Sequence, residues 1–347
     1  MMRTTEKTNH YIAKRLDWLA RVKEPILEPD LPSVDPHHHL WDRPNWRYLH
    51  DDLNADTSSG HNIVATVFVQ CGAYHKADGP EELRPVGETQ FVAGTSAMAE
   101  SGLYGKTRWC EGIVGTADMF LGDRVEPVLE AHVKAANGRF RGIRHITAWD
   151  ADKAIMNPSY SPPQHALKDP KFQAALKTLG KMGFTFDGWM YHPQISDLAT
   201  AAAAVPDTRM VLDHVGGPVA ISAYEGKREA EFPKWAASIK ELAKRPNVYV
   251  KLGGLGMRIN GYGFEDAKDP PTSDMLAAAW KPYIETCIEA FGADRCMYES
   301  NFPVDKGSYS YPIFWNACKK LSKGASADEK RMLFAGTAQK FYRLQKG

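Results

Sequence analysis

A cluster of histidines near the start of the chain is the first feature that could do chemistry. It lies in the string Asp35-Pro36-His37-His38-His39-Leu40-Trp41-Asp42. On a strand, side chains two positions apart share a face, so His37 and His39 should point together and His38 away. Two imidazoles at a strand end can form half of a metal site, or a pair of hydrogen-bond donors for a substrate oxygen. The string therefore predicts a functional centre where the first strand ends.

Other polar and aromatic residues stand at the ends of later strand-like runs. Gln70 ends the second run and could reach a substrate, although an amide there can instead cap a turn. A group of aromatic residues could form a wall for a ring-shaped substrate, although tryptophans more often pack in a core. This group comprises Trp41, Trp46, Tyr48, Trp149, Trp189 and Tyr191. From these residues we expect Gln70 and Trp41 to bind substrate.

The elements that must position these side chains are short apolar runs rich in β-branched residues. There are eight of them: Val34–His39, Ile63–Gln70, Gly112–Ala117, Phe140–Ile146, Phe184–Trp189, Arg209–His214, Val248–Leu252 and Cys296–Glu299. Helical stretches lie between most of them: Glu126–Ala136, Lys171–Met182, Leu198–Ala204, Trp235–Lys244 and Met275–Ala290. Apolar strands that alternate with helices indicate an α/β fold with a parallel sheet. Eight such units in about 250 to 300 residues predict a (β/α)8 TIM barrel.

A doubly wound open sheet is the rival architecture. No G-x-G-x-x-G pattern follows a strand, which removes the commonest reason to prefer a dinucleotide-binding fold. In a barrel, the loops that follow strands lie on the catalytic face. The inserts 40–62 and 254–273 are therefore candidate walls of a pocket, unless they are variable surface loops. We expect residues 34–347 to form one barrel domain.

Residues 1–33 are expected to form a helical extension ahead of the barrel. Apolar residues recur there at helical spacing among charged ones, which predicts an amphipathic helix over Tyr11–Val22. These residues are Ile12, Leu16, Leu19 and Val22. The proline-rich segment Pro25–Pro36 ends the helix. Its apolar stripe would pack on the barrel exterior or on a partner, so self-association into a homo-oligomer is a hypothesis.

Charge and composition exclude several classes of partner. The 347 residues carry 43 Lys and Arg against 42 Asp and Glu, a net charge of +1. No bulk field can recruit nucleic acid or an anionic membrane, so we expect a small-molecule substrate. The five cysteines are odd in number and form no C-x-x-C pair, which argues against a disulfide framework. Without an apolar signal-like or membrane-spanning run, a cytoplasmic location is expected.

Short motifs recur where the predicted strands end. After the first-strand histidines come Gly142-Ile143-Arg144, Tyr191-His192-Pro193-Gln194, Val211-Leu212-Asp213-His214-Val215-Gly216, Val250-Lys251-Leu252-Gly253-Gly254 and Tyr298-Glu299-Ser300-Asn301-Phe302-Pro303-Val304. In this order they resemble the amidohydrolase superfamily, and within it the amidohydrolase 2 group that contains L-fuconolactonase and 2-pyrone-4,6-dicarboxylate hydrolase. The resemblance covers most of the chain and implies a TIM-barrel hydrolase.

The resemblance also implies roles for individual residues. His37, His39 and His192 would bind one divalent metal, Zn or Mn, in metal-dependent members, whereas in metal-free lactonases histidines polarise the scissile carbonyl. Arg144 would bind a substrate carboxylate, unless it forms a structural ion pair. His192 and His214 would complete a ligand set or donate to the developing oxyanion, unless they are core histidines bonded to backbone. The cofactor thus stays open between one metal and none.

Asn301 departs from the pattern of this group. Its eighth strand usually ends in Ser-Asp-x-Pro, and that aspartate ligates metal and takes the proton from the attacking water. An amide cannot serve as a general base near neutral pH. Asn301 would then orient water while Asp213, Glu299, Asp305 or a histidine accepts the proton. Glu299 is the nearest candidate on a regular strand, unless it pairs with Lys251 on the neighbouring strand.

The function expected from these residues is hydrolysis of a lactone or similar cyclic ester that carries a carboxylate. Water would attack a carbonyl polarised by the histidines, with Asn301 among the catalytic residues and Arg144 at the acid. One alternative is a non-oxidative decarboxylase of the aminocarboxymuconate-semialdehyde type, which shares the barrel and the histidine pair. The other is a binding barrel that has lost its catalytic base.

Overall fold

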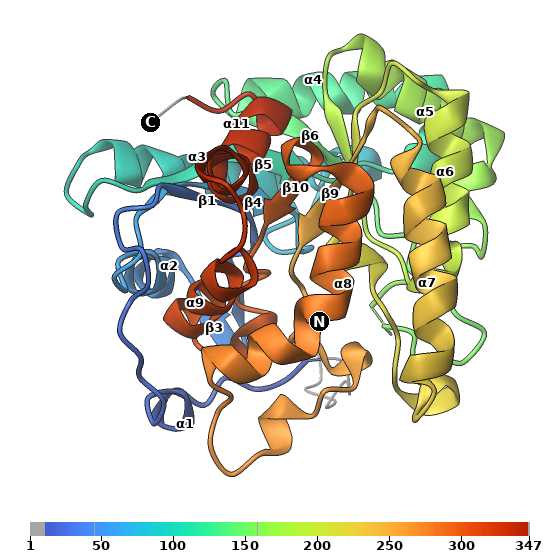
Figure 1. Ribbon diagram of the computed structural model, residues 1–347. Helices are drawn as coiled ribbons and strands as arrows, with labels where there is room; N and C mark the ends of the chain where they lie inside the picture. Colours follow the sequence, from blue (N-terminus) through green and yellow to red (C-terminus); the bar gives the residue numbers. More distant parts are fainter. Residues whose placement is uncertain (1–10, 45, 158, 346–347) are drawn as a thin grey trace.

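Eight parallel strands form the centre of the molecule. The computed structural model describes residues 11–44, 46–157 and 159–345. The strands are hydrogen-bonded in chain order: β1 (Ser33–His38), β4 (Ile63–Val69), β5 (Arg108–Gly115), β6 (Phe140–Arg144), β7 (Thr185–Gly188), β8 (Met210–Leu212), β9 (Val248–Leu252) and β10 (Cys296–Tyr298). Nearly every strand residue is buried, as expected for a parallel sheet covered on both faces. The predicted (β/α)8 barrel is therefore confirmed (Figure 1).

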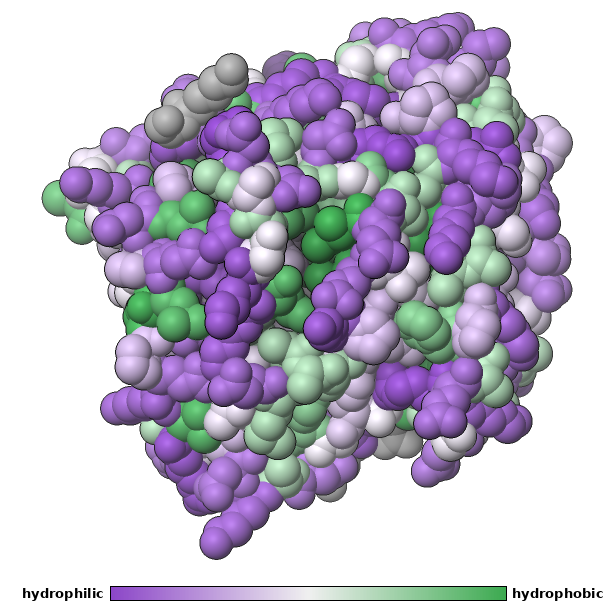
Figure 2. All heavy atoms as spheres, in the orientation of Figure 1, coloured by the Kyte–Doolittle hydropathy of each residue, from purple (hydrophilic) through white to green (hydrophobic). Residues whose placement is uncertain are grey.

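Helices surround this barrel and supply the outer half of the core (Figure 1). They are α3 (Val86–Glu100), α4 (Glu126–Ala135), α5 (Pro170–Lys181), α6 (Ile195–Ala204), α7 (Arg228–Ala243), α8 (Ser273–Phe291), α9 (Tyr311–Leu321), α10 (Ala327–Arg331) and α11 (Thr337–Tyr342). Local sequence fixes some of their starts, because Asp169 caps α5 at Lys171 N and Thr272 caps α8 at Met275 N. Figure 2 shows one face as largely hydrophilic, with hydrophobic side chains gathered mainly in a hollow near its centre. Among the described residues, none of the helices is long and apolar enough to cross a bilayer.

The barrel closes between its first and last strands through both backbone and side-chain hydrogen bonds. His38 and Phe302 form an isolated β-bridge at this seam, where Asn301 N donates to His37 O at 3.0 Å and His39 N to Phe302 O at 2.7 Å. The buried carboxylate of Asp35 accepts hydrogen bonds from Ser300 N at 3.0 Å, Ser300 Oγ at 2.6 Å and Tyr311 Oη at 3.0 Å. Asp35 therefore links β1 to the segment after β10, next to the histidine string.

Two inserts form the rim of the barrel at the carboxyl ends of its strands. The first holds a hairpin of β2 (Trp41–Arg43) and β3 (Trp46–Tyr48), followed by α2 (His50–Thr57). It is tied to the barrel by Lys306, whose Nζ lies 2.7 Å from both oxygens of Asp56. The second insert, residues 254–273, follows β9 and contains two short turns of 3-10 helix. Both inserts contribute side chains to the central cavity described below, as expected.

The amphipathic helix expected over Tyr11–Val22 is mostly absent. Within the described part, only Leu16–Leu19 (α1) is helical, and residues 1–10 lie outside the described residues. Trp18 Nε1 instead donates to the carbonyls of Ala267 and Lys268, and Figure 1 shows this segment beside the insert after β9. Ile12 and Leu19 are buried, with Ile12 next to Gly307 of the barrel, whereas Leu16 is 54% exposed. Tertiary contacts with the insert thus outweigh the helical periodicity.

Replacing Asp35 tests the seam. Asp35→Ala removes the acceptor of buried donors on Ser300, Tyr311 and His37, so the free energy of unfolding should fall by about 2 to 4 kcal/mol. Urea unfolding followed by circular dichroism measures this change. The exposed Asp30→Ala serves as control and should change stability by less than about 0.5 kcal/mol. An Asp35→Ala protein as stable as the wild type would show that the seam does not depend on this carboxylate.

The pKa of Asp35 predicts that the stability difference between wild type and Asp35→Ala depends on pH. Burial raises the pKa of Asp35 to about 6 in the folded protein, above its ordinary value of about 3.9 in the unfolded chain. The folded state therefore holds the proton more tightly, and this contribution to stability is lost as pH rises through about 6. The stability difference between wild type and Asp35→Ala should be larger at pH 5 than at pH 7.5, by about 1 kcal/mol. A difference independent of pH would contradict the assignment.

Candidate active site

A cavity opens at the carboxyl ends of the barrel strands. Side chains that follow different strands converge on it, including His39 after β1, Arg144 at the end of β6, His214 after β8 and Asn301 after β10. This is the end of a TIM barrel where catalytic residues collect. None of the described residues that line the cavity is an aspartate or a glutamate, whereas two of them are arginines. The cavity is thus built for a neutral or anionic ligand.

His39 presents one defined nitrogen to the cavity. Its Nδ1 lies 2.8 Å from the carbonyl oxygen of Val69, and a carbonyl can only accept, so Nδ1 carries the hydrogen. Its Nε2 therefore carries the lone pair in the neutral ring. Burial, together with the nearby guanidinium of Arg144, lowers the pKa of His39 well below its usual range. His39 is thus a neutral acceptor that binds a proton only weakly.

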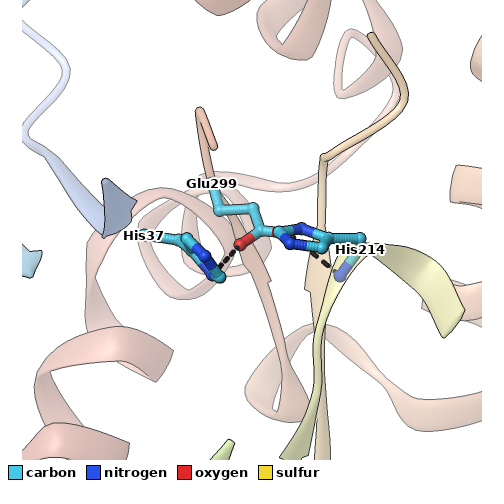
Figure 3. A group of neighbouring side chains, drawn as sticks. All are labelled: His37, His214 and Glu299. Atoms are coloured by element: carbon cyan, nitrogen blue, oxygen red, sulfur yellow. Dashed lines mark hydrogen bonds and ion pairs between the residues drawn. The ribbon is translucent and has the colours of Figure 1, made fainter. Parts of the chain in front are cut away.

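Glu299 lies between two imidazole rings (Figure 3). Its Oε1 is 2.6 Å from His214 Nδ1 and 3.0 Å from His214 N, and its Oε2 is 2.8 Å from His37 Nδ1. Burial alone would raise the pKa of Glu299, but the imidazoles of His214 and His37 hold it well below its usual range. An ionised Glu299 accepts a hydrogen bond from His214, so the hydrogen of the neutral His214 ring lies on Nδ1. Its Nε2 then carries a lone pair and is available to a substrate.

His37 is held inside the barrel rather than at the cavity surface. Its Nδ1 lies 2.8 Å from Glu299 Oε2, within ion-pair distance, and its Nε2 lies 3.3 Å from Arg144 Nη1. Lys251 Nζ is hydrogen-bonded to His37 Nδ1 at 3.0 Å and to Asp187 Oδ2 at 2.8 Å, and it lies 3.0 Å from Asp213 Oδ1. Burial and this ammonium group lower the pKa of His37 well below its usual range. His37 is therefore a neutral ring whose two nitrogens are both used internally.

Arg144 lies at the floor of the cavity without an acidic partner among the described residues. It is 5% exposed and donates through Nη2 to the carbonyl of Gln70, while its buried Nε has no hydrogen-bond partner in the described part of the chain. A buried guanidinium without a carboxylate is unusual, since buried charges are normally paired. The structural ion pair considered for Arg144 is not found, and a negative ligand group would satisfy it.

The amide of Asn301 is fixed by Asp305. Its Nδ2 donates to Asp305 Oδ1 at 2.9 Å, and Asp305 Oδ2 accepts from Tyr309 Oη at 2.5 Å and Gly256 N at 2.8 Å. The carboxylate of Asp305 accepts hydrogen bonds, so the group of Asn301 that faces it must be the NH2, which donates. Its remaining oxygen, Oδ1, is an acceptor at the cavity wall. Asn301 therefore accepts from a water or hydroxyl rather than donating to a carbonyl.

Local backbone geometry holds His214 and Asn301 in place. Both have left-handed conformations, each with φ of 56°, which cost free energy in residues other than glycine. Gly254, with φ of 67°, allows His214 to pack closely, because a Cβ at this position would lie 2.4 Å from the imidazole Cγ. Trp189 packs edge to face on the other side of the ring, with centroids 4.7 Å apart.

His192 does not join this centre. Its Nδ1 accepts from Val219 N at 3.1 Å, and its Nε2 lies 3.5 Å from Glu231 Oε2 at the side of the barrel. The expected ligand set of His37, His39 and His192 is therefore not assembled. The reason is local: β7 ends at Gly188, and His192 begins a 3-10 turn, where the alternation of a strand no longer applies.

The donor atoms that do converge fit a metal poorly. Atoms of His37, His214 and Glu299 lie within 4.8 Å of one another. However, His214 Nδ1 is already hydrogen-bonded to the carboxylate, and the two nitrogens of His37 face the cations Lys251 and Arg144. A divalent cation there would replace these bonds and be repelled by both cations. We therefore derive no catalytic step through a metal.

Of the two residues expected to bind substrate besides Arg144, one lines the cavity and the other does not. Trp41 lines the cavity and stacks on His39, with ring centroids 5.6 Å apart. Gln70 offers its carbonyl to Arg144 instead of its side chain to the cavity. Sequence reasoning missed Arg43 and Tyr11, which also line the cavity. Neither stands at a barrel strand end, so the strand-end rule gave no signal for them.

Comparison with known proteins agrees with this architecture. The amidohydrolase family model matches residues 34–344. An uncharacterized protein, y4mH, from Sinorhizobium fredii is 32% identical over 337 residues, which cover 91% of this chain and 99% of that protein. An L-fucono-1,5-lactonase from Burkholderia ambifaria is 25% identical over 290 residues, covering 79% and 88% of the two chains.

Solved structures show the same fold. The crystal structure of an amidohydrolase from Burkholderia multivorans with bound zinc has a TM-score of 0.69 and 22% sequence identity, and the match covers 90% of this chain and 99% of that one. The order of the strand-end motifs, the barrel and the extent of the family match agree over almost the whole chain. The protein is therefore an enzyme that belongs to the amidohydrolase family.

Proposed function

We propose that this enzyme opens a lactone or similar cyclic ester in a small molecule that carries a carboxylate. The observation that carries the proposal is the pair of His214 and ionised Glu299 at a cavity that also holds the unpaired guanidinium of Arg144. Relatives named L-fucono-1,5-lactonase support ring opening of an ester. The lack of acidic side chains among the described cavity-lining residues supports an anionic substrate.

His214 is the general base in this mechanism. Its Nε2 takes a proton from water as the water oxygen attacks the carbonyl carbon, and Glu299 stabilises the imidazolium that forms. The same imidazolium then returns the proton to the ring oxygen as the carbon–oxygen bond breaks. One water is consumed, and the product is a hydroxy acid. This relay supplies the base that Asn301 cannot be.

The other cavity residues orient water and stabilise charge. His39 Nε2 and Asn301 Oδ1 are both acceptors, so they can hold the hydrogens of a water whose lone pair faces the carbonyl. The guanidinium of Arg144 stabilises the negative charge that develops on the carbonyl oxygen. His39 is the poorer base, because its imidazolium would lie beside Arg144 with only a neutral carbonyl as partner.

Removing the base or its carboxylate should abolish most of the turnover. His214→Gln and Glu299→Gln should each lower kcat by about 10² to 10⁴, since a positioned general base contributes this much. The measurement is initial rate on a panel of carboxylated and sugar lactones with a pH indicator. The exposed His165→Gln, 56% exposed at its side chain, serves as control and should keep the wild-type rate. A His214→Gln enzyme with more than about a tenth of the wild-type kcat would exclude this role.

Chelation separates this mechanism from a metal-dependent one. The crowded donor set predicts that protein purified without a histidine tag and dialysed against EDTA keeps its turnover. Loss of activity that Zn²⁺ or Mn²⁺ restores would contradict this expectation. On the same panel, release of carbon dioxide without ring opening would favour the decarboxylase, and ligand binding without any turnover would favour a binding barrel.

A further inference from the structure

Residues 11–21, which we call the strap, lie ahead of the part of the chain that the family model matches. The strap contacts loops at the carboxyl ends of the barrel strands. Lys14 Nζ lies 3.2 Å from Asp52 Oδ1 in the insert after β1, and Trp18 Nε1 donates to the carbonyl of Lys268 at 3.1 Å in the insert after β9. This end of a TIM barrel carries the catalytic residues. The strap therefore crosses the catalytic face.

Tyr11, at the start of the strap, joins two sides of the cavity. Its hydroxyl accepts a hydrogen bond from Asn157 Nδ2 at 3.1 Å, in the segment after β6, and its side chain is also hydrogen-bonded to Arg43 of the β2–β3 hairpin. The hairpin follows β1, and two strands, β4 and β5, lie between β1 and β6 in the barrel. Because Tyr11 also lines the cavity, its ring lies over the opening between these two loops.

The ring of Tyr11 is held in this position from both sides. The guanidinium of Arg43 lies 5.4 Å from its centroid, in a cation–π contact, while Asn157 bonds to its hydroxyl. The ring cannot turn aside without losing these contacts. Arg43 Nη2 also donates to the carbonyl of Cys71 at 2.9 Å, so the turn after β4 lies close to this side of the cavity. Cys71 lines the cavity but is only 4% exposed.

We propose that Tyr11 limits the size of the molecules that enter the cavity, and that the strap holds its ring in place. Tyr11 is thus a specificity-determining residue that comes from outside the family domain. A molecule too large for the closed cavity enters only when the strap opens locally, which happens in a small fraction of the molecules. This inference concerns entry to the cavity and does not depend on the reaction proposed above.

Labelling of Cys71 by maleimides of two sizes tests this limit without turnover. The small N-ethylmaleimide and the bulky N-pyrenylmaleimide share one reactive group, so the ratio of their rates reports size. Burial and Glu88 raise the pKa of the Cys71 thiol, which slows both reagents alike. Mass spectrometry of peptides measures the rate at each cysteine in protein without an N-terminal tag.

Tyr11→Ala should admit the bulky reagent. Its rate at Cys71, relative to that of N-ethylmaleimide, should rise by about tenfold or more over the wild type, because a ring and two hydrogen bonds that close the cavity are lost. Tyr11→Phe, which keeps the ring without the hydroxyl, should lie between the two.

A matched control comes from the same strap. Leu16 is exposed, so Leu16→Ala should keep the wild-type ratio. An unchanged ratio in Tyr11→Ala, or no labelling of Cys71 by either reagent, would overturn the proposal, and so would an equal effect of Leu16→Ala. The other four cysteines are buried away from the cavity and report unfolding: Cys110, Cys287, Cys296 and Cys318.

Labelling of all five cysteines at equal rates in Tyr11→Ala would also overturn the proposal, because the ring would then stabilise the whole fold instead of limiting entry. An enzyme that opens no lactone, yet shows the expected change at Cys71, would overturn the proposed function and leave this inference standing.

Discussion

A carboxylate buried inside a protein must be matched by positive charge or by hydrogen-bond donors, because an isolated ion in the interior costs several kcal/mol. Asp187, Asp213 and Glu299 are all completely buried in the barrel. Lys251 Nζ lies 3.0 Å or less from an oxygen of each of the two aspartates, and this leaves Glu299 to the imidazoles. The carboxylate of Glu299 places the hydrogen of His214 on Nδ1. In the proposed mechanism this leaves Nε2 of His214 to take a proton from water.

This arrangement explains how the site can work with an amide at position 301. Glu299 lies two residues earlier on the same segment, and in the proposed mechanism it acts through His214 instead of touching water itself. The alternative that Glu299 forms an ion pair with Lys251 is not found among the described residues, because its Oε1 is hydrogen-bonded to His214 and its Oε2 lies 2.8 Å from His37 Nδ1. Asn301 keeps a place at the cavity but changes its chemistry, from a proton acceptor to a neutral hydrogen-bond acceptor held by Asp305.

Much of the fold could be predicted from the sequence, because apolar strands and intervening helices alternate with a clear period. The closeness of His37 and His39 also followed from strand geometry, and their rings lie 5.0 Å apart. Strand alternation could not show that His37 is enclosed, since its environment comes from β6, β9 and the segment after β10. The position of His192 depends on a turn, and the shortness of the N-terminal helix depends on tertiary contacts. Neither produces a periodic pattern in the sequence.

Tyr11 comes from the segment that precedes the barrel, yet its ring forms part of the cavity wall and contacts Trp46 with centroids 4.9 Å apart. This matters for handling the protein in the laboratory. A tag or fusion partner at the N-terminal side of the chain leads into Tyr11 at the cavity wall. The last described helix, α11, by contrast, lies at the end of the barrel away from β3 in Figure 1. Recombinant versions for ligand screening are therefore better extended at the C-terminus.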